Sequence, residues 1–170
     1  MLFRSKKALI LAPGSGAKEK NWPMEFYNIV GKWWEKELGG KVILLFGPAE
    51  EESGEIKKSW GDGIAIQGLE LARVAALLKR SYFYLGNDSG ISHLAAALGV
   101  NSVVLFGPSD PIQWAPRGKR TSVISKNVGC SPCAHSIMKA CPHRKCLTEL
   151  APESVIKVIE GLVEDLQSRD

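Results

Sequence analysis

Unbroken apolar runs, separated by stretches of helical periodicity, are the feature that most constrains the fold of this chain. Three such runs, at residues 7–12, 42–46 and 102–106, are apolar at nearly every position. A strand that is apolar on both faces is buried on both faces, which is typical of parallel sheets covered by helices. The pattern therefore predicts an α/β fold, with a doubly wound, mostly parallel sheet and helices on both faces.

The other elements alternate as such a sheet requires. Shorter runs predict strands at residues 64–66, 82–85 and 121–125, and the last of these is the weakest. Helical patterns start at Pro23 and also cover residues 50–60, 69–79, 90–98 and 152–168.

Two of these predicted helices carry apolar residues at a spacing that places them on one face. The first has Phe26, Ile29, Val30, Trp33 and Trp34, and the last has Val155, Ile159, Leu162, Val163 and Leu166. We expect the last stripe to pack either on its own domain or against a domain outside this chain.

Size and charge narrow the class of protein. With 170 residues, 45% of them hydrophobic, the chain is expected to form a single domain over residues 1–170. The net charge of +4 comes from basic residues scattered among 18 acidic ones, which favours a small anionic ligand or an acidic membrane surface over nucleic acid. No apolar run approaches the roughly 20 residues of a spanning helix, and residues 1–7 lack the pattern of a signal peptide. We expect a cytoplasmic protein, peripheral to a membrane at most.

Two small, polar, glycine-bearing loops follow strands that are expected to be neighbours. The sequence PGSG at residues 13–16 follows the first strand, and GNDSG at residues 86–90 follows the fourth. In a doubly wound sheet, ligands bind beyond the carboxyl ends of the strands at the point where the strand order reverses, which is between these two strands. The two loops are therefore predicted to line one ligand crevice.

The second loop has the composition of an anion site. Ser89 is placed to cap a helix that begins at Gly90, so that the free amides of the first turn face a ligand such as phosphate. His93 lies one turn into this helix and is able to donate to a phosphate oxygen. Asp88 carries a like charge, so it is expected to fix the loop, to pair with a cation or to accept from a sugar hydroxyl. Ordinary helix capping also explains Asp-Ser-Gly before a helix.

Lys20 is the cation best placed to meet a diphosphate across this crevice. It follows the first loop and precedes Trp22-Pro23, where the next helix starts. The alternative for a loop lysine is a solvated side chain with no ligand. Neither loop carries the glycine fingerprint of dinucleotide-binding proteins or a P-loop, which disfavours a nicotinamide dehydrogenase and a P-loop phosphotransferase.

Short motifs occur in a fixed order along nearly the whole chain. They are Pro13-Gly14, then Lys20-x-Trp22-Pro23, Phe46-Gly47 followed by acidic residues, Asp88-Ser89-Gly90-x-x-His93-x-Ala95-Ala96-Ala97, and Gly107-Pro108-Ser109-Asp110-Pro111. In this order they resemble the carboxyl-terminal half of glycosyltransferase family 9, the ADP-heptose:lipopolysaccharide heptosyltransferases. The resemblance implies a GT-B enzyme, in which two Rossmann-like domains face a cleft and the second holds the ADP-sugar donor.

The resemblance also implies roles for individual residues. Ser89, Gly90 and His93 form the diphosphate site, and Lys20 contacts the phosphates. Asp88 orders its loop or touches the sugar, and Glu51 binds the ribose hydroxyls. Ser15 and Gly16 line the same cleft.

The reaction implied by the resemblance is inverting transfer of heptose from ADP-heptose to a lipopolysaccharide core acceptor, with no cofactor required. In the family the catalytic base and the acceptor contacts belong to the amino-terminal domain, and no residue here matches that base. The isolated chain is therefore expected to bind nucleotide without transferring sugar. The full enzyme is expected in the cytoplasm, with peripheral contact at the inner face of the bacterial inner membrane.

Two other functions remain open at this point. The same loops suit another GT-B enzyme, such as a nucleotide-sugar epimerase or a hexosyltransferase. A noncatalytic nucleotide-binding or zinc-knuckle module is the second alternative. It is disfavoured because residues 130–146 include no Phe, Tyr or Trp on which a base would stack.

All four cysteines lie in one loop, residues 128–147. They are Cys130, Cys133, Cys141 and Cys146, with His135 and His143 between them. Thiolates at such short spacing are able to close around a structural zinc ion, and a loop rich in Pro and Lys has little apolar surface to hold it otherwise. The alternative of equal weight is no metal, with four reduced thiols, or with one or two disulfides if the protein is oxidised. A catalytic metal is not expected.

Overall fold

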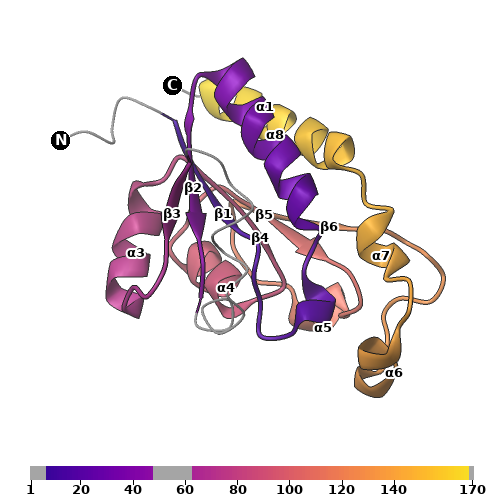
Figure 1. The fold of residues 1–170 in the computed structure, drawn as a ribbon. Helices are drawn as coiled ribbons and strands as arrows, with labels where there is room; N and C mark the ends of the chain where they lie inside the picture. Colours follow the sequence, from indigo (N-terminus) through magenta and orange to yellow (C-terminus); the bar gives the residue numbers. More distant parts are fainter. Residues whose placement is uncertain (1–6, 48–62, 169–170) are drawn as a thin grey trace.

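The computed structural model describes residues 7–47 and 63–168, and its strands form one sheet (Figure 1). The six strands are β1 (Ala8–Ala12), β2 (Lys41–Leu45), β3 (Ile64–Ile66), β4 (Phe83–Asn87), β5 (Ser102–Phe106) and β6 (Thr121–Ser125). They run in the order β3-β2-β1-β4-β5-β6, and all five pairings are parallel. The predicted doubly wound parallel sheet is confirmed.

Helices connect the strands at both faces. They are η1 (Lys18–Lys20, a 3-10 turn), α1 (Met24–Leu38), α3 (Leu71–Arg80), α4 (Gly90–Ala97), α5 (Pro111–Trp114), α6 (His135–Ala140), α7 (Lys145–Thr148) and α8 (Pro152–Gln167). The short helices α6 and α7 within the cysteine-rich loop were not predicted by periodicity, because each is too short to show a repeating stripe. The helix predicted over residues 50–60 lies outside the described residues.

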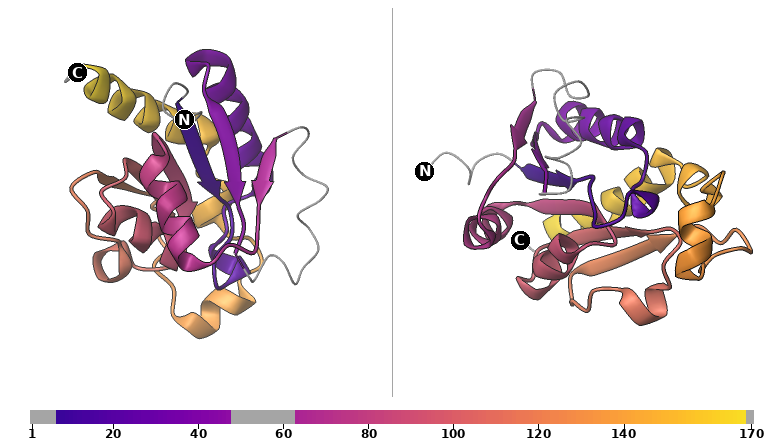
Figure 2. Two further views of the ribbon diagram at one scale, coloured as in Figure 1. Left: turned by 90° about the vertical axis from the view of Figure 1, so that its left-hand side faces the viewer. Right: turned by 60° about the horizontal axis from the view of Figure 1, so that its bottom comes forward.

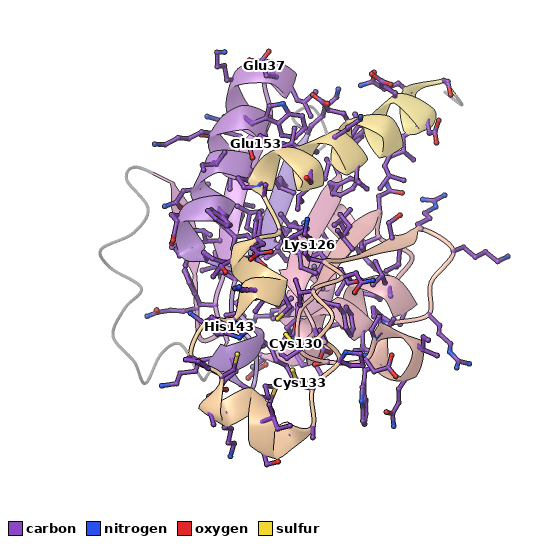
Figure 3. The ribbon with its side chains drawn as sticks, turned by 90° about the vertical axis from the view of Figure 1, so that its right-hand side faces the viewer. Glu37, Lys126, Cys130, Cys133, His143 and Glu153 are labelled. Carbon is purple, nitrogen blue, oxygen red and sulfur yellow. The ribbon has the colours of Figure 1, made fainter. Side chains whose placement is uncertain are left out.

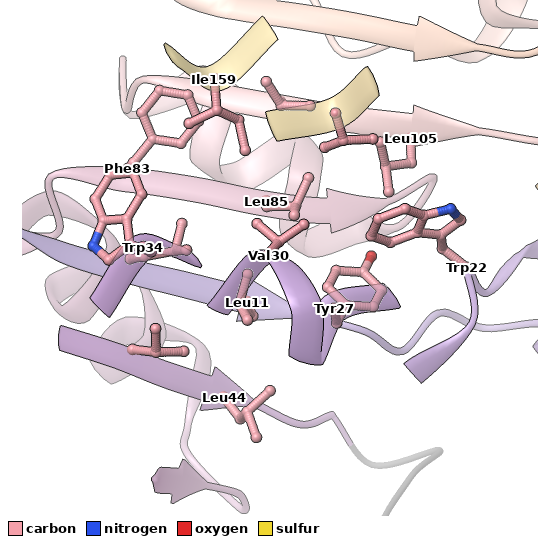
Figure 4. Close-up of a cluster of buried hydrophobic side chains, with 14 of the residues drawn as sticks. Leu11, Trp22, Tyr27, Val30, Trp34, Leu44, Phe83, Leu85, Leu105 and Ile159 are labelled. Carbon is pink, nitrogen blue, oxygen red and sulfur yellow. The ribbon is translucent and has the colours of Figure 1, made fainter. Parts of the chain in front are cut away.

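Each face of the sheet has its own apolar core. Because successive side chains of a strand point to opposite faces, Leu9 and Leu11 of β1 join a cluster under α1 and α8, while Ile10 joins a second cluster under α3 and α4. The four helices lie accordingly on two sides of the sheet (Figures 1 and 2). Figure 4 shows the first cluster, with Trp22 at one end and Trp34 at the other.

The buried face of α1 differs from the predicted stripe. Tyr27, Val30, Gly31 and Trp34 are buried, whereas Ile29 is 42% exposed. The true stripe keeps helical spacing but includes a glycine and a tyrosine, which a search for apolar residues passes over. The Tyr27 hydroxyl on this face bonds to the buried Asn87 side chain. The helix is terminated by Gly39, which adopts a left-handed conformation (φ 61°) that glycine tolerates best.

The last helix packs on this chain. Val155, Ile159 and Val163 of α8 are buried in the cluster that α1 also covers, and the two helices contact each other. Of the two alternatives for this stripe, packing on its own domain is confirmed. Within the described ranges, no helix has the length and apolar composition needed to cross a bilayer.

Candidate functional site

The two loops singled out in the sequence meet at the carboxyl ends of the central strands β1 and β4. Strand β1 pairs with β2 on one side and with β4 on the other, so the strand order reverses between β1 and β4. The carboxyl ends of these two strands lead directly into the loops at residues 13–16 and 86–90. The two loops therefore lie side by side at the switch point, and a ligand crevice between them stays a prediction.

An ion pair joins the two loops. Lys20 Nζ lies 2.7 Å from Asp88 Oδ2, across 68 residues of sequence. The Lys20 side chain is 28% exposed and that of Asp88 only 9%, so the carboxylate is nearly enclosed while the ammonium group reaches solvent. Pairing with a cation was one of the roles predicted for Asp88, and this one is confirmed. A lysine ammonium has three donor hydrogens, so Lys20 is able to serve Asp88 and an anion together.

Ser89 occupies the N-cap of α4 but does not cap it with its side chain. Its carbonyl accepts from the amides of Ser92 (3.1 Å) and His93 (3.3 Å), and its backbone is extended, as at an N-cap. Its hydroxyl instead lies 3.4 Å from the hydroxyl of Ser92. The prediction of a side-chain cap is therefore wrong, and the reason is the competing hydroxyl one turn away. The amides at the start of α4 are left without a capping side chain.

The start of α4 is open. Gly90 is exposed, and a Cβ built on it would meet nothing within 4 Å. His93, one turn further, is exposed, and its imidazole makes no hydrogen bond or ion pair to any of the described residues. An uncovered helix start with exposed amides favours anions, because the positive end of the helix dipole lies there.

The first loop is shaped by Ser15. Its hydroxyl lies 2.7 Å from the carbonyl oxygen of Ala17 and 2.6 Å from Asn21 Oδ1, and it accepts from the amide of Ala17. This hydroxyl therefore holds the turn that leads into η1. Gly16 beside it faces open space, since an added Cβ would meet nothing within 4 Å. Glu51, the residue predicted at the ribose, lies outside the described residues.

Asn87 is the residue of this region that the sequence analysis missed. It is fully buried, and its side chain makes three hydrogen bonds. Oδ1 accepts from the amide of Trp22 (3.0 Å) and from the hydroxyl of Tyr27 (2.9 Å), and Nδ2 donates to the carbonyl of Pro13 (2.6 Å). The sequence did contain one indication of its burial. Asn87 lies two residues after Leu85 and four after Phe83, so its side chain points to the same buried face of β4 as theirs.

A second buried polar group links Asn87 to α4. The Ser92 hydroxyl donates to the carbonyl of Asn87 (2.6 Å) and lies 2.9 Å from the hydroxyl of Tyr84. Burial raises the pKa of Tyr84 to about 12, so this hydroxyl stays neutral at physiological pH. The buried Ser92 hydroxyl thereby holds the first turn of α4 against the end of β4, while Gly90 at the start of the helix is exposed.

The cysteine-rich loop packs beside this edge of the sheet. The amide of Cys133 donates to the carbonyl of Pro108 (2.7 Å), and Arg144 Nη1 donates to the carbonyl of Lys18 (3.2 Å). Figure 3 shows Cys130, Cys133 and His143 at the same end of the molecule as α6. The loop therefore contacts the segment after β5 and the 3-10 turn that carries Lys20.

The four thiols are free, and their environments differ. Backbone amides of Arg144 and His143 lower the pKa of the Cys141 thiol. Burial, then the neighbouring thiols, raises the pKa of Cys133, and the same causes raise that of Cys146 to about 11. Among the described residues no three His, Cys, Asp or Glu side chains are arranged as ligands of one metal ion. The zinc site stays a prediction.

Similar proteins identify the family of this chain. The sequence profile described as "Glycosyltransferase family 9 (heptosyltransferase)" matches residues 2–143. The lipooligosaccharide heptosyltransferase 2 of Campylobacter jejuni is 28% identical over 177 residues, which cover 97% of this chain and 54% of that protein. The chain spans about half the length of the curated relatives it matches.

Solved structures share the fold. The crystal structure of the glycosyl transferase family 9 from Veillonella parvula aligns with a TM-score of 0.77 and 27% identity, over 95% of this chain and 47% of that one. The Escherichia coli ADP-heptose lps heptosyltransferase II aligns with a TM-score of 0.78 and 24% identity, over 98% of this chain and 49% of that one. With the profile covering most of its length, the chain belongs to glycosyltransferase family 9, the heptosyltransferase family.

Proposed function

We propose that this chain is the donor-binding domain of an enzyme that transfers heptose from ADP-heptose to a lipopolysaccharide core acceptor with inversion. Support comes from the family, from relatives that are named heptosyltransferases, and from a matched length of about half of theirs. The observation that carries the proposal is the contact between Lys20 and Asp88 (2.7 Å), which brings a cation to the uncovered start of α4.

In this proposal the diphosphate of the donor lies at the start of α4. The free amides of the first turn and the His93 side chain donate to phosphate oxygens, and Lys20 supplies a positive charge from the facing loop. Asp88 holds Lys20 in place through their ion pair. Gly16 and Gly90 line the space with no side chain, which leaves room for the phosphates.

The same groups favour departure of ADP. As the bond between the sugar and the diphosphate breaks, negative charge grows on the leaving phosphate, and donors already aimed at it stabilise the transition state more than the ground state. The acceptor hydroxyl attacks from the opposite side of the sugar, which inverts the configuration. The proposal requires no cofactor for catalysis, because backbone amides, Lys20 and His93 supply the donors.

The proposal also covers the ribose of the donor, the acceptor and the location of the full enzyme. Glu51 binds the ribose hydroxyls, and Ser15 lines the cleft through the loop that it shapes. The catalytic base and the acceptor contacts belong to an amino-terminal half, so the isolated chain binds nucleotide and does not transfer sugar. The full enzyme works in the cytoplasm, with peripheral contact at the inner membrane where its lipid-linked acceptor lies.

We also propose that Cys130, Cys133, Cys141 and Cys146 hold a structural zinc ion that takes no part in the reaction. Thiolates at these spacings are a ligand set that zinc accepts in structural sites. All four thiols are free and lie within one loop, which supports the proposal. Elemental analysis is expected to find about one zinc ion per chain. Metal-free protein with the same thermal stability before and after added zinc would contradict it.

Calorimetric titration with nucleotides tests the donor site. We expect the chain to bind ADP more tightly than AMP, because the site grips the second phosphate, and more tightly than UDP or GDP. A preference for UDP would favour a hexosyltransferase or an epimerase over a heptosyltransferase. The absence of binding to every nucleotide, in a chain shown to be folded by circular dichroism, would overturn the proposed function.

A further inference from the structure

We propose that Asn87 is the positioning residue of the diphosphate site, whose side-chain amide sets where Lys20 stands relative to the start of α4. This inference rests on the proposed function, because it assumes that a diphosphate binds there. Asn87 itself is fully buried and is not expected to touch the ligand.

The hydrogen bonds of Asn87 fall on both sides of Lys20 in the sequence. Nδ2 donates to Pro13, at the start of the first loop, and Oδ1 accepts from the amide of Trp22, just after the 3-10 turn. The segment from residue 13 to residue 22 is therefore fixed at its two ends by one side chain. Lys20 lies within this segment, and its ammonium reaches Asp88, the next residue after Asn87.

The backbone of Asn87 extends the same connection to the helix. Its carbonyl accepts from the hydroxyl of Ser92, which lies in the first turn of α4. Through its side chain Asn87 holds the loop with the cation, and through its carbonyl it holds the turn with the exposed amides. The two groups that are proposed to grip a diphosphate thus share one buried anchor.

Only a side chain with both an acceptor and a donor satisfies this arrangement. The amide of Trp22 cannot accept and the carbonyl of Pro13 cannot donate, so the amide orientation of Asn87 is determined by its partners. An ionised aspartate at this position accepts from Trp22 and Tyr27 but repels the Pro13 carbonyl. A protonated aspartate donates to that carbonyl and restores all three bonds.

This difference makes Asn87→Asp a pH-dependent test. We expect N87D to bind ADP about tenfold or more weakly than wild type at about pH 8, and within about threefold of wild type at about pH 5, where the buried carboxyl is protonated. Tyr27 on α1 contacts Asn87 directly, Tyr84 on β4 is linked to it through Ser92, and Asp88, the next residue in the chain, is paired with Lys20. Burial raises the pKa of Tyr27, so it stays neutral throughout this range.

Two variants control for general destabilisation. Ser102→Ala removes a buried hydrogen bond of the same kind, to the carbonyl of Val100 (2.7 Å), at the opposite edge of the sheet. Tyr27→Phe removes one bond to Asn87 but leaves those to Pro13 and Trp22. Both are expected to lower the melting temperature and to keep ADP affinity within about twofold of wild type at either pH.

The possible results distinguish a failure of the proposed nucleotide binding from a failure of the role proposed for Asn87. If wild type fails to bind ADP, the proposed function is wrong. If wild type binds and N87D matches it at both pH values, or is equally weak at both, Asn87 does not position the site.

Hydrogen exchange of the wild-type chain gives an independent readout without ligand or variant. The amide of Trp22 is expected to open together with those of Ser92 and His93, with protection factors within about tenfold of one another. Much weaker protection at Trp22 would show that the first loop opens without Asn87, and would overturn the inference even if N87D does not fold.

Discussion

The donor loops and the cysteine-rich loop lie at the same edge of the sheet and are held there in different ways. Buried side chains from the core, above all Trp22 and Asn87, fix the donor loops. The cysteine-rich loop is held by a few hydrogen bonds, such as that from Cys133 to Pro108, and by the buried side chains of Met138, Cys146 and Leu147, while most of its other residues are exposed. The comparison teaches that short loops can be fixed by buried side chains along their length, whereas a longer neighbouring loop is buried at a few positions only and exposes the rest.

The largest expected effect contrasts one apolar side chain from each region. Trp22 is 2% exposed, packs edge-on against Phe26 and Tyr27, and donates from Nε1 to the carbonyl of Leu150. Ile137 on α6 is 61% exposed. Urea denaturation is expected to show a loss of about 4 kcal/mol for Trp22→Ala and of less than about 0.5 kcal/mol for Ile137→Ala. Comparable losses would mean that the two loops are held alike.

A second prediction removes the cation from the donor loops. Lys20→Met is expected to weaken ADP binding by about 2 kcal/mol, because a charge-assisted contact with phosphate is lost. It also leaves the Asp88 carboxylate, 9% exposed, without its partner, so the free energy of unfolding should fall. The double variant K20M/D88N serves as the control, since it should recover stability without recovering affinity. Recovery of affinity in the double variant would count against a direct role of Lys20 at the phosphates.

A third prediction uses the empty space at the start of α4. Gly90→Ala places a methyl group where the structure has no neighbour within 4 Å, so the free energy of unfolding should change by less than about 0.5 kcal/mol. ADP affinity should nevertheless fall about tenfold, because the methyl group occupies the approach of the phosphates. Gly161→Ala on α8 also meets nothing within 4 Å and is the matched control. Equal affinities of the two variants would place the nucleotide elsewhere.

The smallest expected effect concerns the cysteine-rich loop alone. Because backbone amides lower the pKa of Cys141, its thiolate forms at lower pH, whereas Cys146 is buried with a pKa of about 11. In metal-free protein near pH 7, Cys141 should therefore react with iodoacetamide before Cys146. Mass spectrometry of digested samples follows both sites, and added zinc should slow the reaction of both. Faster alkylation of Cys146 would show that the loop opens more readily than its contacts suggest.

The sequence predicted the sheet and the meeting of the two loops because both follow from periodicity and chain order. Unbroken apolar runs imply a parallel sheet, and a parallel sheet brings the ends of β1 and β4 to one edge. Pairing of Asp88 with a cation was one of three predicted roles, but the sequence did not indicate Lys20 as the partner. The side-chain cap at Ser89 was predicted wrongly, because the Ser92 hydroxyl that competes for it is a detail of packing.

The residues that were missed are those whose role depends on partners far away in sequence. Asn87 bonds to Pro13, 74 residues earlier, and no local pattern marks that partner. Tyr27 and Gly31 were passed over in α1 because a hydroxyl-bearing ring and a residue without a side chain do not stand out in an apolar pattern, although both lie on its buried face. The state of the cysteines depends on atoms other than those of the chain, so their spacing alone left two alternatives.

The hydroxyl of Ser92, turned inward to the carbonyl of Asn87 and to Tyr84, has a consequence for the thermodynamics of binding. A helix start that is already immobilised from beneath has little conformational entropy left to lose when an anion arrives. Its amides are preorganised, so nucleotide association should be accompanied by a small change in backbone order at α4. The affinity of such a site then reflects its contacts rather than the cost of arranging them.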